Sequence, residues 1–521
     1  MQTPKYKPLL FTTTVRNPKR MKGLLNVLLD YDQEILTNEL CIAIIGDLIK
    51  YGLYRPIKTE KTIKQKWEIQ IVLTDDEINT ILVNNPQEHK EAGFLKGWPS
   101  RFATIFDFAK ELGFVYYWIN EPIEFSEIGK KLARSIDISE VGEEYLISEP
   151  HPEYEQQAFL HALAKYQRNN PFVRVLNENV PLILLLQVIR RLNADPNFNN
   201  TGISRLEIPL IIFWKDNDSE ALYNLIKRIR KKNGYSPSWE TIIDICINEI
   251  MDGEFKKFKP KSIMMEYPDE FIRKMRLTGL ISLRGGGRFI DINTKELEKV
   301  EYILTNYADY IKYDSEIEYF NYMATTDENL ISTREEVVDI EENDKLLSKW
   351  IAVYSWDQIK HELMILAEKK LSQDTLLKIL SNPVRLEFLT ALAIKYSYPG
   401  IKVMPNYPCD DEGIPTNTAG GVGDKGDIEC YSDTNGVLIE VTLSEGRIQT
   451  VMEVWPISRH LEEFSKHTEN SKCYFIAPSI FKDSERQIDF VKESDGLNIE
   501  PFTIRAFVNY IDLKNELFQF N

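Results

Sequence analysis

The chain has 521 residues, more than one hydrophobic core usually organises, so we expect three or four domains or subdomains. It is 43% hydrophobic and 27% charged, as globular proteins are, and its longest apolar stretch, 181–189, is far shorter than the roughly 20 residues of a membrane span. A net charge of −17 argues, taken alone, against a nucleic-acid partner, because binding phosphates requires Lys and Arg.

The N-terminal sequence and the cysteines indicate where the protein is located in the cell. The N-terminus, "MQTPKYKPLL", lacks the apolar core of a signal peptide. The five cysteines are scattered, odd in number and without a CxxC pair. These features predict a cytoplasmic protein with reduced thiols, without a zinc site and without a membrane partner.

Basic residues are concentrated in two places. The first 29 residues contain six Lys and Arg and no acid, and residues 227–288 are locally basic, whereas acids gather at 314–344. A single basic run is more often a solvated surface, but two runs inside DNA-binding folds favour contacts with phosphates. Since Arg also pairs well with guanine, the candidate DNA-contacting residues are Arg16, Lys19, Arg20, Lys22, Arg101, Arg284 and Arg288.

Residues 100–136 predict a helix, a strand, a turn and a second helix. The helical period of "ATIFDFAKEL" ends at Gly113, a residue type favoured just after a helix. The run "FVYYWI" is typical of a strand, and Ser126 can cap the helix "EIGKKLARSI". We interpret this order as a winged-helix module inside a first DNA-recognition subdomain, 1–150. Ordinary amphipathic helices and hairpins are the alternative.

Residues 271–304 repeat this order with a helix, the strand "TGLI", a glycine turn, the strand "RFIDI" and a helix capped by Thr294. Upstream, Ser204 and Glu207 have the spacing of a capping box that begins a helix. The pattern predicts a second winged-helix module, in a subdomain spanning 151–310. The glycines at 285–287 lack the GxxxxGK[ST] spacing of a phosphate-binding loop and fit a wing turn better.

The last third of the chain changes character. Residues 311–375 predict an acidic and helical linker. In the following segment, 376–521, Asn382 is the expected N-cap of a helix that begins at Pro383. Strands then alternate with helices, which predicts an α/β or α+β domain and, for the whole chain, a multidomain α+β protein.

The stretch "GDKGDIECYSDTNGVLIEVTLSEG", 423–446, carries acids on two β-type runs. A hairpin with an even-numbered loop around Asn435-Gly436 puts Asp427, Glu440 and Thr442 on one face. A four-residue loop places Asp427 opposite Thr442 and diagonal to Glu440, with Cβ atoms about 7–8 Å apart. A carboxylate inside an apolar strand is costly unless it is paired or bound to a cation, and Mg²⁺ prefers such oxygens. A solvent-facing surface hairpin is the alternative.

Three further residues extend this group. Glu387 interrupts an apolar helix, and Glu453 and His460 lie two turns apart on nearly one face of another. Beside three acids, His460 has the chemistry to position or deprotonate water. The alternative is a histidine with a purely structural role.

Together with "EVWPISRHL" and "CYFIAP", in this order, the hairpin resembles the AlwI-like family of type IIS restriction endonucleases and related nicking enzymes. The resemblance implies winged-helix recognition subdomains, a helical linker, and a C-terminal nuclease domain of the PD-(D/E)xK type that uses one or two Mg²⁺ ions. It implies catalytic roles for Asp427, Glu440, Glu387, His460, Glu453 and Thr442, and metal ligation by Asp427, Glu440, Val441 and Glu387. Thr442 stands where these nucleases usually have Lys, and Gly426 departs from the family's Pro.

The resemblance implies a bacterial, cytoplasmic enzyme that binds a short asymmetric site in double-stranded DNA and hydrolyses phosphodiesters a few nucleotides outside it. With one active site per chain, a double-strand break needs a second monomer, a partner nuclease subunit or two sequential nicks. The alternatives are a non-catalytic winged-helix regulator, or another PD-(D/E)xK nuclease of DNA repair or of a mobile element.

Overall fold

The computed structural model describes residues 5–10, 18–173, 175–253, 258–332, 340–416 and 425–520. Helices and strands are both present and helices predominate, so the predicted mixed α+β class is confirmed. The chain forms two compact units, Met1–Arg284 with Arg288–Thr333, and Gly285–Gly287 with Arg334–Asn521. This boundary falls within the expected linker, 311–375, and the finer division into four segments stays a prediction.

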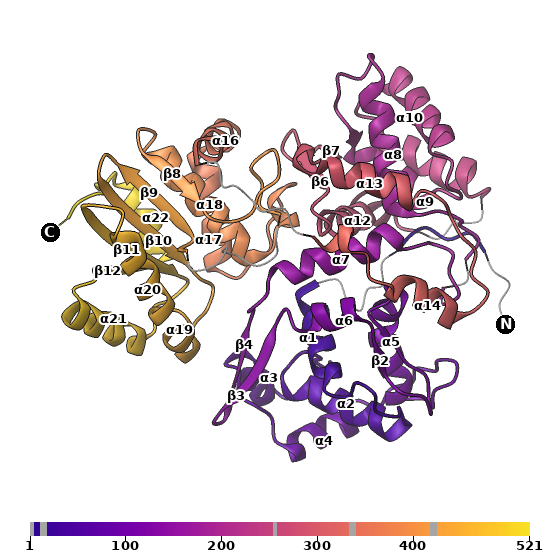
Figure 1. Cartoon of the computed structure of the whole chain (residues 1–521), viewed down its shortest axis with the longest axis horizontal. Coiled ribbons are helices and arrows are strands. Elements are labelled where there is room, and N and C mark those ends of the chain that lie inside the picture. Colours follow the sequence, from indigo (N-terminus) through magenta and orange to yellow (C-terminus); the bar gives the residue numbers. More distant parts are fainter. Residues whose placement is uncertain are drawn as a thin grey trace. The chain divides into compact units, whose positions relative to one another are not determined.

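The first unit begins with helices and two short hairpins (Figure 1). Its elements up to residue 148 are α1 (Pro18–Leu29), α2 (Asn38–Lys50), α3 (Lys61–Glu68), α4 (Asp75–Asn84), α5 (Trp98–Glu111), β1 (Val115–Tyr116), β2 (Glu124–Phe125), α6 (Glu127–Ala133), β3 (Asp137–Val141) and β4 (Glu144–Ser148). The hairpins are antiparallel, β1 with β2 and β3 with β4.

The expected boundaries around α5 and α6 are present. Gly113 ends α5 in the left-handed region, with φ 73°, and its N–H donates to the carbonyl of Lys110. The Ser126 hydroxyl accepts the N–H of Gly129 and so caps α6. The expected six-residue strand is reduced to β1, since only Val115 and Tyr116 pair with β2. The expected turn after it is present at Asn120, where φ is 66°. The order of elements is therefore as predicted, while the winged-helix assignment stays a prediction.

The remaining part of the first unit is mostly helical. Its elements are α7 (Glu153–Lys165), α8 (Pro181–Ala194), β5 (Ile203–Ser204), η2 (Arg205–Glu207), α9 (Ile208–Phe213), α10 (Ser219–Asn233), α11 (Trp239–Asp244), the π-helical turns η3 (Ile245–Ile250) and η4 (Ser262–Glu266), α12 (Tyr267–Arg276), β6 (Ile281–Arg284), β7 (Phe289–Ile292), η5 (Thr294–Glu296), α13 (Leu297–Asn306), α14 (Glu316–Ala324) and α15 (Glu328–Ile331).

The second repeat also has its expected order, with one corrected cap. The capping box of Ser204 and Glu207 is formed, and β5, β7 and β6 make a three-stranded antiparallel sheet. Gly285, Gly286 and Gly287 all have positive φ, which explains a glycine-only turn between β6 and β7. The predicted cap Thr294 is wrong by one residue: the side chain of Asn293 accepts the N–H of Lys295, because Asn293 is the extended residue before the turn.

The second unit is a five-stranded sheet covered by helices. Its elements are α16 (Ile340–Val353), α17 (Trp356–Ala367), η6 (Leu377–Ile379), α18 (Asn382–Ser397), β8 (Lys402–Pro405), β9 (Ile428–Ser432), β10 (Asn435–Val441), α19 (Arg447–Met452), α20 (Val454–Ser465), β11 (Asn470–Ala477), α21 (Lys482–Asp495), β12 (Ile499–Thr503) and α22 (Ile504–Asp512). The N-cap of α18 is Ser381, one residue before the predicted Asn382, with Pro383 in the first turn.

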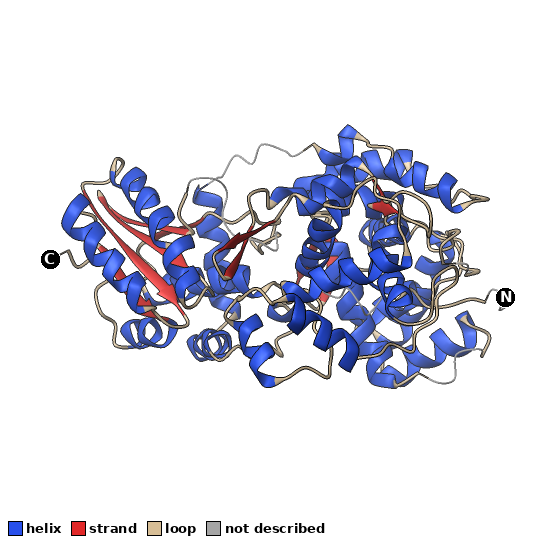
Figure 2. Ribbon diagram, turned by 90° about the horizontal axis from the view of Figure 1, so that it is seen from below, coloured by secondary structure: helices blue, strands red, loops and turns tan. Residues whose placement is uncertain are grey.

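The sheet is mixed, with strand order β12-β11-β10-β9-β8. Strands β10, β11 and β12 run parallel, and β8, β9 and β10 are antiparallel neighbours. Figure 2 shows helices on either side of these strands. A buried apolar cluster joins one face of the sheet to α20 and α21 and includes Leu438, Val454, Ile457, Leu461, Phe475 and Ile488. Because strand residues alternate between faces, Glu440 lies on the same face as Leu438, toward α20.

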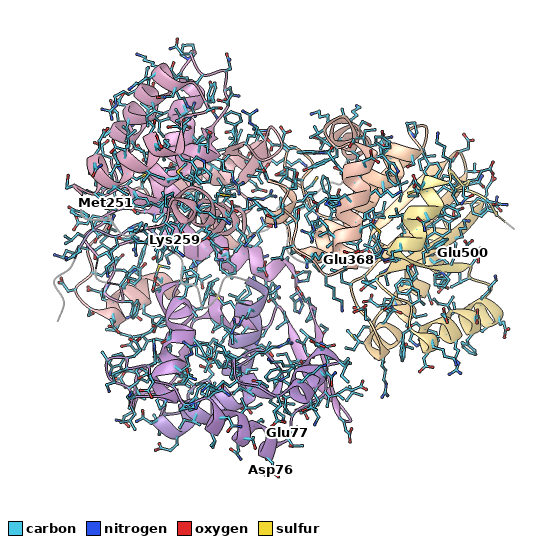
Figure 3. All side chains as sticks on the ribbon, turned by 180° about the vertical axis from the view of Figure 1, so that it is seen from behind. Asp76, Glu77, Met251, Lys259, Glu368 and Glu500 are labelled. Carbon is cyan, nitrogen blue, oxygen red and sulfur yellow. The ribbon has the colours of Figure 1, made fainter. Side chains whose placement is uncertain are left out.

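Ion pairs tie the outer helices of this unit to one another. Glu368, which follows α17, pairs with Lys370 at 2.6 Å and with Arg505 of α22 at 2.7 Å; its position is labelled in Figure 3. Asp512 at the end of α22 accepts a hydrogen bond from the indole of Trp356 in α17. No helix in the described ranges combines the length and the apolar character needed to cross a membrane.

We expect Gly129→Ala to destabilise the first unit. A Cβ atom at this helical position would lie 1.9 Å from the carbonyl oxygen of Phe114, a backbone atom that the N–H of Ser126 already holds. Relieving the overlap requires α6 to move, at a cost of about 1–3 kcal/mol in the free energy of unfolding. Thermal and urea unfolding measure the effect.

The matched control is Gly400→Ala, where no atom lies within 4 Å of the new methyl group. We expect this control to leave the stability almost unchanged. Equal stability of the two variants would contradict the close packing of α6 against Phe114.

Candidate active site

The hairpin of β9 and β10 brings two carboxylates to face each other. The register pairs Ser432 with Asn435 and Ile428 with Ile439, so Asp427 lies directly opposite Glu440, one step further along. The predicted four-residue loop is wrong: the turn has two residues, and Asp433 takes the left-handed conformation, with φ 51°, that it requires. An even-numbered loop was nevertheless correct, which is why Asp427 and Glu440 share a face.

Asp427 is fixed by the backbone of the facing strand. Its Oδ2 atom accepts the N–H of Val441 at 2.7 Å. Burial raises the pKa of Asp427 well above its usual value, and the charge of Glu440 raises it further. Burial likewise raises the pKa of Glu440, with the neighbouring Glu453 as the next cause. Ionising both of these buried, facing acids is therefore unfavourable unless a cation is near.

Glu387 of α18 adds a third buried acid. It is 3% exposed, and its Oε2 atom has no hydrogen-bond partner among the described residues. Burial raises its pKa well above the ordinary value, and Asp427 and then Glu440 raise it further through their charges. A buried carboxylate oxygen without a donor is costly when the group is ionised, so burial here favours the protonated form of Glu387.

His460 of α20 contacts the strand acid directly. Its Nδ1 atom lies 2.8 Å from Oε1 of Glu440, and the tautomer with hydrogen on Nδ1 donates to that oxygen. The apolar residues Ile457 and Leu461 on the same helix are buried against the sheet, which sets the rotation of α20 and aims His460 at Glu440. The predicted association of this histidine with the acids is thus present.

Glu453 sits where α19 ends and α20 begins, and it holds the loop after β10. Its Oε1 atom accepts the hydroxyl of Thr442 at 2.7 Å and the hydroxyl of Ser444 at 2.7 Å. The Thr442 oxygen in turn accepts the N–H of Ser444 at 3.0 Å. Thr442 therefore supplies no charge to this group, and its hydrogen is committed to Glu453.

The donor set suits a hard cation in part. Among the residues that the structure describes, no three His, Cys, Asp or Glu side chains have the spacing of a metal site. Mg²⁺, however, usually binds through one or two carboxylates plus water and substrate phosphate, which the facing pair Asp427 and Glu440 can provide. Val441 can add only its carbonyl oxygen, and ligation by Glu387 stays a prediction.

The predicted DNA-contacting residues are in different environments. Arg16 and the side chain of Lys19 lie outside the described residues. The Nε–H of Arg20 donates to the carbonyl of Leu53 at 3.1 Å, and that of Arg101 donates to the Tyr54 hydroxyl at 2.9 Å. Arg284 pairs with Asp291 at 2.8 Å, and Arg288 is exposed beside the ring of Phe289.

Lys22 is fully buried and does not reach the surface. Its Nζ atom pairs with Glu155 at 2.7 Å and with Glu149 at 2.9 Å. Burial lowers its pKa, but the two carboxylates more than offset this and raise the pKa overall. Lys22 thus neutralises acids within the first unit, so we leave it out of the residues proposed to contact DNA.

Two residues of the site were not anticipated. Ser444 lies in the stretch "TLSEG", where a hydroxyl two residues after Thr442 is the only cue. Gln449 is an ordinary helical glutamine in the sequence, yet it is fully buried and bonded to two loops. No local pattern distinguishes such a residue, because two of its three partners, Ser479 and Phe481, are 30 and 32 residues away.

A family model described as "AlwI restriction endonuclease" matches residues 110–341 and 314–510, which together are more than half of the chain. The chain belongs to this family. Membership confirms the resemblance seen in the sequence and implies that this AlwI-family protein is a DNA nuclease. Among curated proteins, none matches the chain.

Three solved structures show weaker similarity. The small subunit, R.BspD6I2, of the heterodimeric restriction endonuclease R.BspD6I is 27% identical over 30% of this chain and 80% of that chain, with a TM-score of 0.25. The restriction endonuclease FokI is 12% identical over 99% of this chain and 96% of that chain, with a TM-score of 0.25. FokI bound to DNA is 12% identical over 98% and 96%, with a TM-score of 0.22.

The buried acids make the stability of the second unit depend on pH. Because the folded pKa of Glu387 lies above that of an unfolded carboxyl, the folded chain binds a proton that the unfolded chain has released. Stability is therefore greatest below the unfolded pKa and falls as pH rises toward the folded pKa. Asp427 and Glu440 act in the same direction.

We expect Glu387→Gln to raise the melting temperature of the second unit at about pH 8 with chelator present, because Gln keeps the shape without the charge. The difference should largely vanish at about pH 4, where Glu387 is mostly protonated in both states. Differential scanning calorimetry measures both. Glu462→Gln, an exposed change on α20, is the control; a gain equal to that of the control would contradict the burial of charge at Glu387.

Proposed function

We propose that this AlwI-family protein is a Mg²⁺-dependent type IIS restriction endonuclease or nicking endonuclease, which binds a short asymmetric DNA site and cuts a few nucleotides outside it. The observation that carries the proposal is the facing pair Asp427 and Glu440 at the end of β10 in a chain of a restriction endonuclease family. Buried acids with raised pKa values and without a Lys or Arg ion-pair partner among the described residues are typical of a cation site rather than of a surface hairpin.

The chain's own residues have separable tasks in this proposal. The N–H of Val441 orients Asp427, and His460 orients Glu440 and shares a proton with it at Nδ1. Glu453 holds Thr442 and Ser444, which fixes the loop at the end of the catalytic strand. When bound, Mg²⁺ supplies charge neutralisation of the scissile phosphate and acidifies water. Water adds to phosphorus and the bond to the 3′-oxygen breaks, which leaves a 5′-phosphate and a 3′-hydroxyl.

The first unit is proposed to bind the DNA, and its second basic run divides into internal and outward cations. Arg230 of α10 is buried against Glu207 at 2.7 Å. On the opposite face of the helix, a hollow of about 470 Å³ is lined by Asn224, Lys227, Arg228, Lys231 and Lys232. Lys227 pairs with Asp195 and Arg228 with Glu249.

Lys231 and Lys232 are exposed, and neither has an ion-pair partner among the described residues. In a chain of net charge −17, two uncompensated lysines beside two partly compensated cations form a local site for a polyanion. We therefore assign phosphate contacts to this face of α10, with Arg288 as a candidate for contact with phosphate or base.

One active site cuts one strand at a time. A double-strand break then requires a second monomer, a partner nuclease subunit or two sequential nicks. Run-off sequencing of both strands of a cut plasmid distinguishes nicking from double-strand cleavage and gives the recognition site and the offset. Sequence-specific gel shifts without any Mg²⁺-dependent cleavage would favour the non-catalytic regulator, and cleavage at no constant offset would favour a repair or mobile-element nuclease.

We expect Asp427→Asn to reduce cleavage by roughly a thousandfold or more, because it removes one of two facing carboxylates from the reacting site. Binding of the specific DNA, measured by fluorescence anisotropy in Ca²⁺, should be unchanged. Glu493→Gln, an exposed change on α21, serves as the control. Loss of DNA binding along with cleavage would mean that Asp427 supports the fold rather than the reaction.

We expect the double variant Lys231→Ala, Lys232→Ala to weaken binding to specific and random DNA alike. Each lost phosphate contact should reduce the slope of log affinity against log salt by about one. The control pair Lys61→Ala, Lys64→Ala removes two exposed charges from α3. An unchanged salt slope in the α10 variant would remove this face from the DNA interface.

A further inference from the structure

Gln449 is a polar residue with no exposed surface at all. It lies in α19, which in the sequence stands between Glu440 of β10 and His460 of α20, and its exposed fraction is 0%. Burying an amide side chain costs free energy unless its donors and acceptor are all satisfied. An apolar side chain would fill the same space without that requirement, so the bonds that Gln449 makes explain its presence.

Its carboxamide joins two loops. The Nε2 group donates to the carbonyl of Ser444 at 3.1 Å and to the carbonyl of Ser479 at 2.9 Å. The Oε1 atom accepts the N–H of Phe481 at 2.9 Å. Both amide hydrogens are therefore used, each on a different loop, and the oxygen adds a second bond to the loop of Ser479.

These loops follow adjacent parallel strands. Strands β10 and β11 pair in register up to Val441 and Ile476, and the N–H of Thr442 still donates to the carbonyl of Ile476 at 3.0 Å. Beyond this point the pairing of β10 with β11 ends, and each strand continues into its own loop. Gln449 continues the connection past the end of the sheet, at the edge where Glu440 and Thr442 lie.

Ser444 is consequently held through each of its polar groups. Its carbonyl accepts from Gln449, its hydroxyl donates to Glu453, and its N–H donates to Thr442. Gln449 and Glu453 are four residues apart, and the N–H of Glu453 donates to the carbonyl of Gln449 at 3.1 Å. One helical segment thus fixes the loop from two sides.

We propose that Gln449 is a positioning residue of the nuclease site: by clamping the loop after β10 to the loop after β11, it holds Thr442 and Glu440 in the geometry that metal binding and cleavage require. This inference rests on the proposed nuclease function. Gln449 touches neither of the facing acids, so its effect passes through Ser444, Thr442 and the end of β10.

The test compares Gln449→Met, which keeps the length of the side chain and removes all three bonds, with Gln519→Ala, a change at an exposed position of the same unit. Four quantities are measured: the single-turnover rate of cleavage, the Mg²⁺ concentration for half-maximal rate, the affinity for specific DNA in Ca²⁺, and the rise in melting temperature that Mg²⁺ causes in DNA-free protein.

For Gln449→Met we expect cleavage to slow by about 10–100-fold, as for other residues that orient metal-site groups. The half-maximal Mg²⁺ concentration should rise and the Mg²⁺-induced shift in melting temperature should shrink, while DNA affinity stays as in the wild type. Ser444→Ala acts on the same loop, so the two changes combined should be less than additive. If Gln449→Met fails to fold, the shorter Gln449→Asn takes its place.

Two results would overturn the inference while leaving the nuclease proposal intact. One is a variant that behaves as Gln519→Ala in all four measurements. The other is a less stable variant whose folded fraction keeps the wild-type rate and Mg²⁺ dependence, which would make Gln449 structural only. Wild-type protein that neither cuts DNA nor responds to Mg²⁺ would instead overturn the nuclease proposal, and this inference with it.

Discussion

The mutual repulsion of buried carboxylates at the end of β10 is the constraint around which the second unit is arranged. Asp427 and Glu440 face each other across the hairpin, and Glu387 adds a third charge from α18. The backbone N–H of Val441 bonds Asp427, and the imidazole of His460 bonds Glu440. Asp427 itself also hydrogen-bonds Glu440 through its backbone and its side chain.

The packing of the apolar core offsets the free-energy cost of burying these acids, and it also sets their orientation relative to α20. Leu438, on the same face as Glu440, packs with Val454, Ile457 and Leu461 of α20. The contacts that bury these side chains fix the rotation of α20, and that rotation places His460 within 2.8 Å of Glu440. Stability and function thus have a common origin here: the same packing that holds the sheet together places the histidine on the acid.

How far the sequence predicted these features depends on how local their causes are. Alternation along a strand and an even-numbered loop are local rules, and they correctly placed Asp427 and Glu440 on one face. The length of the turn was missed because Asp433, rather than the Asn435-Gly436 pair, takes the left-handed conformation. Lys22 looked like a surface cation, since nothing near it in the sequence reveals Glu149 and Glu155. The role of Gln449 was missed for a similar reason, because two of its three partners, Ser479 and Phe481, lie in a distant loop.

The neutral hydroxyl of Thr442 changes the electrostatics that this site must satisfy. A lysine at this position would offset one of the acids, whereas Thr442 donates its hydrogen to Glu453 and brings a further carboxylate close to Asp427 and Glu440. Glu387, Asp427, Glu440 and Glu453 thus act on one another through their charges, and Glu440 contacts the imidazole of His460. In the proposed nuclease, a divalent cation would offset both these acids and the charge of the phosphate. Thr442 carries no charge to offset the acids. Its hydrogen bonds to Glu453 and Ser444 instead fix the loop that follows β10.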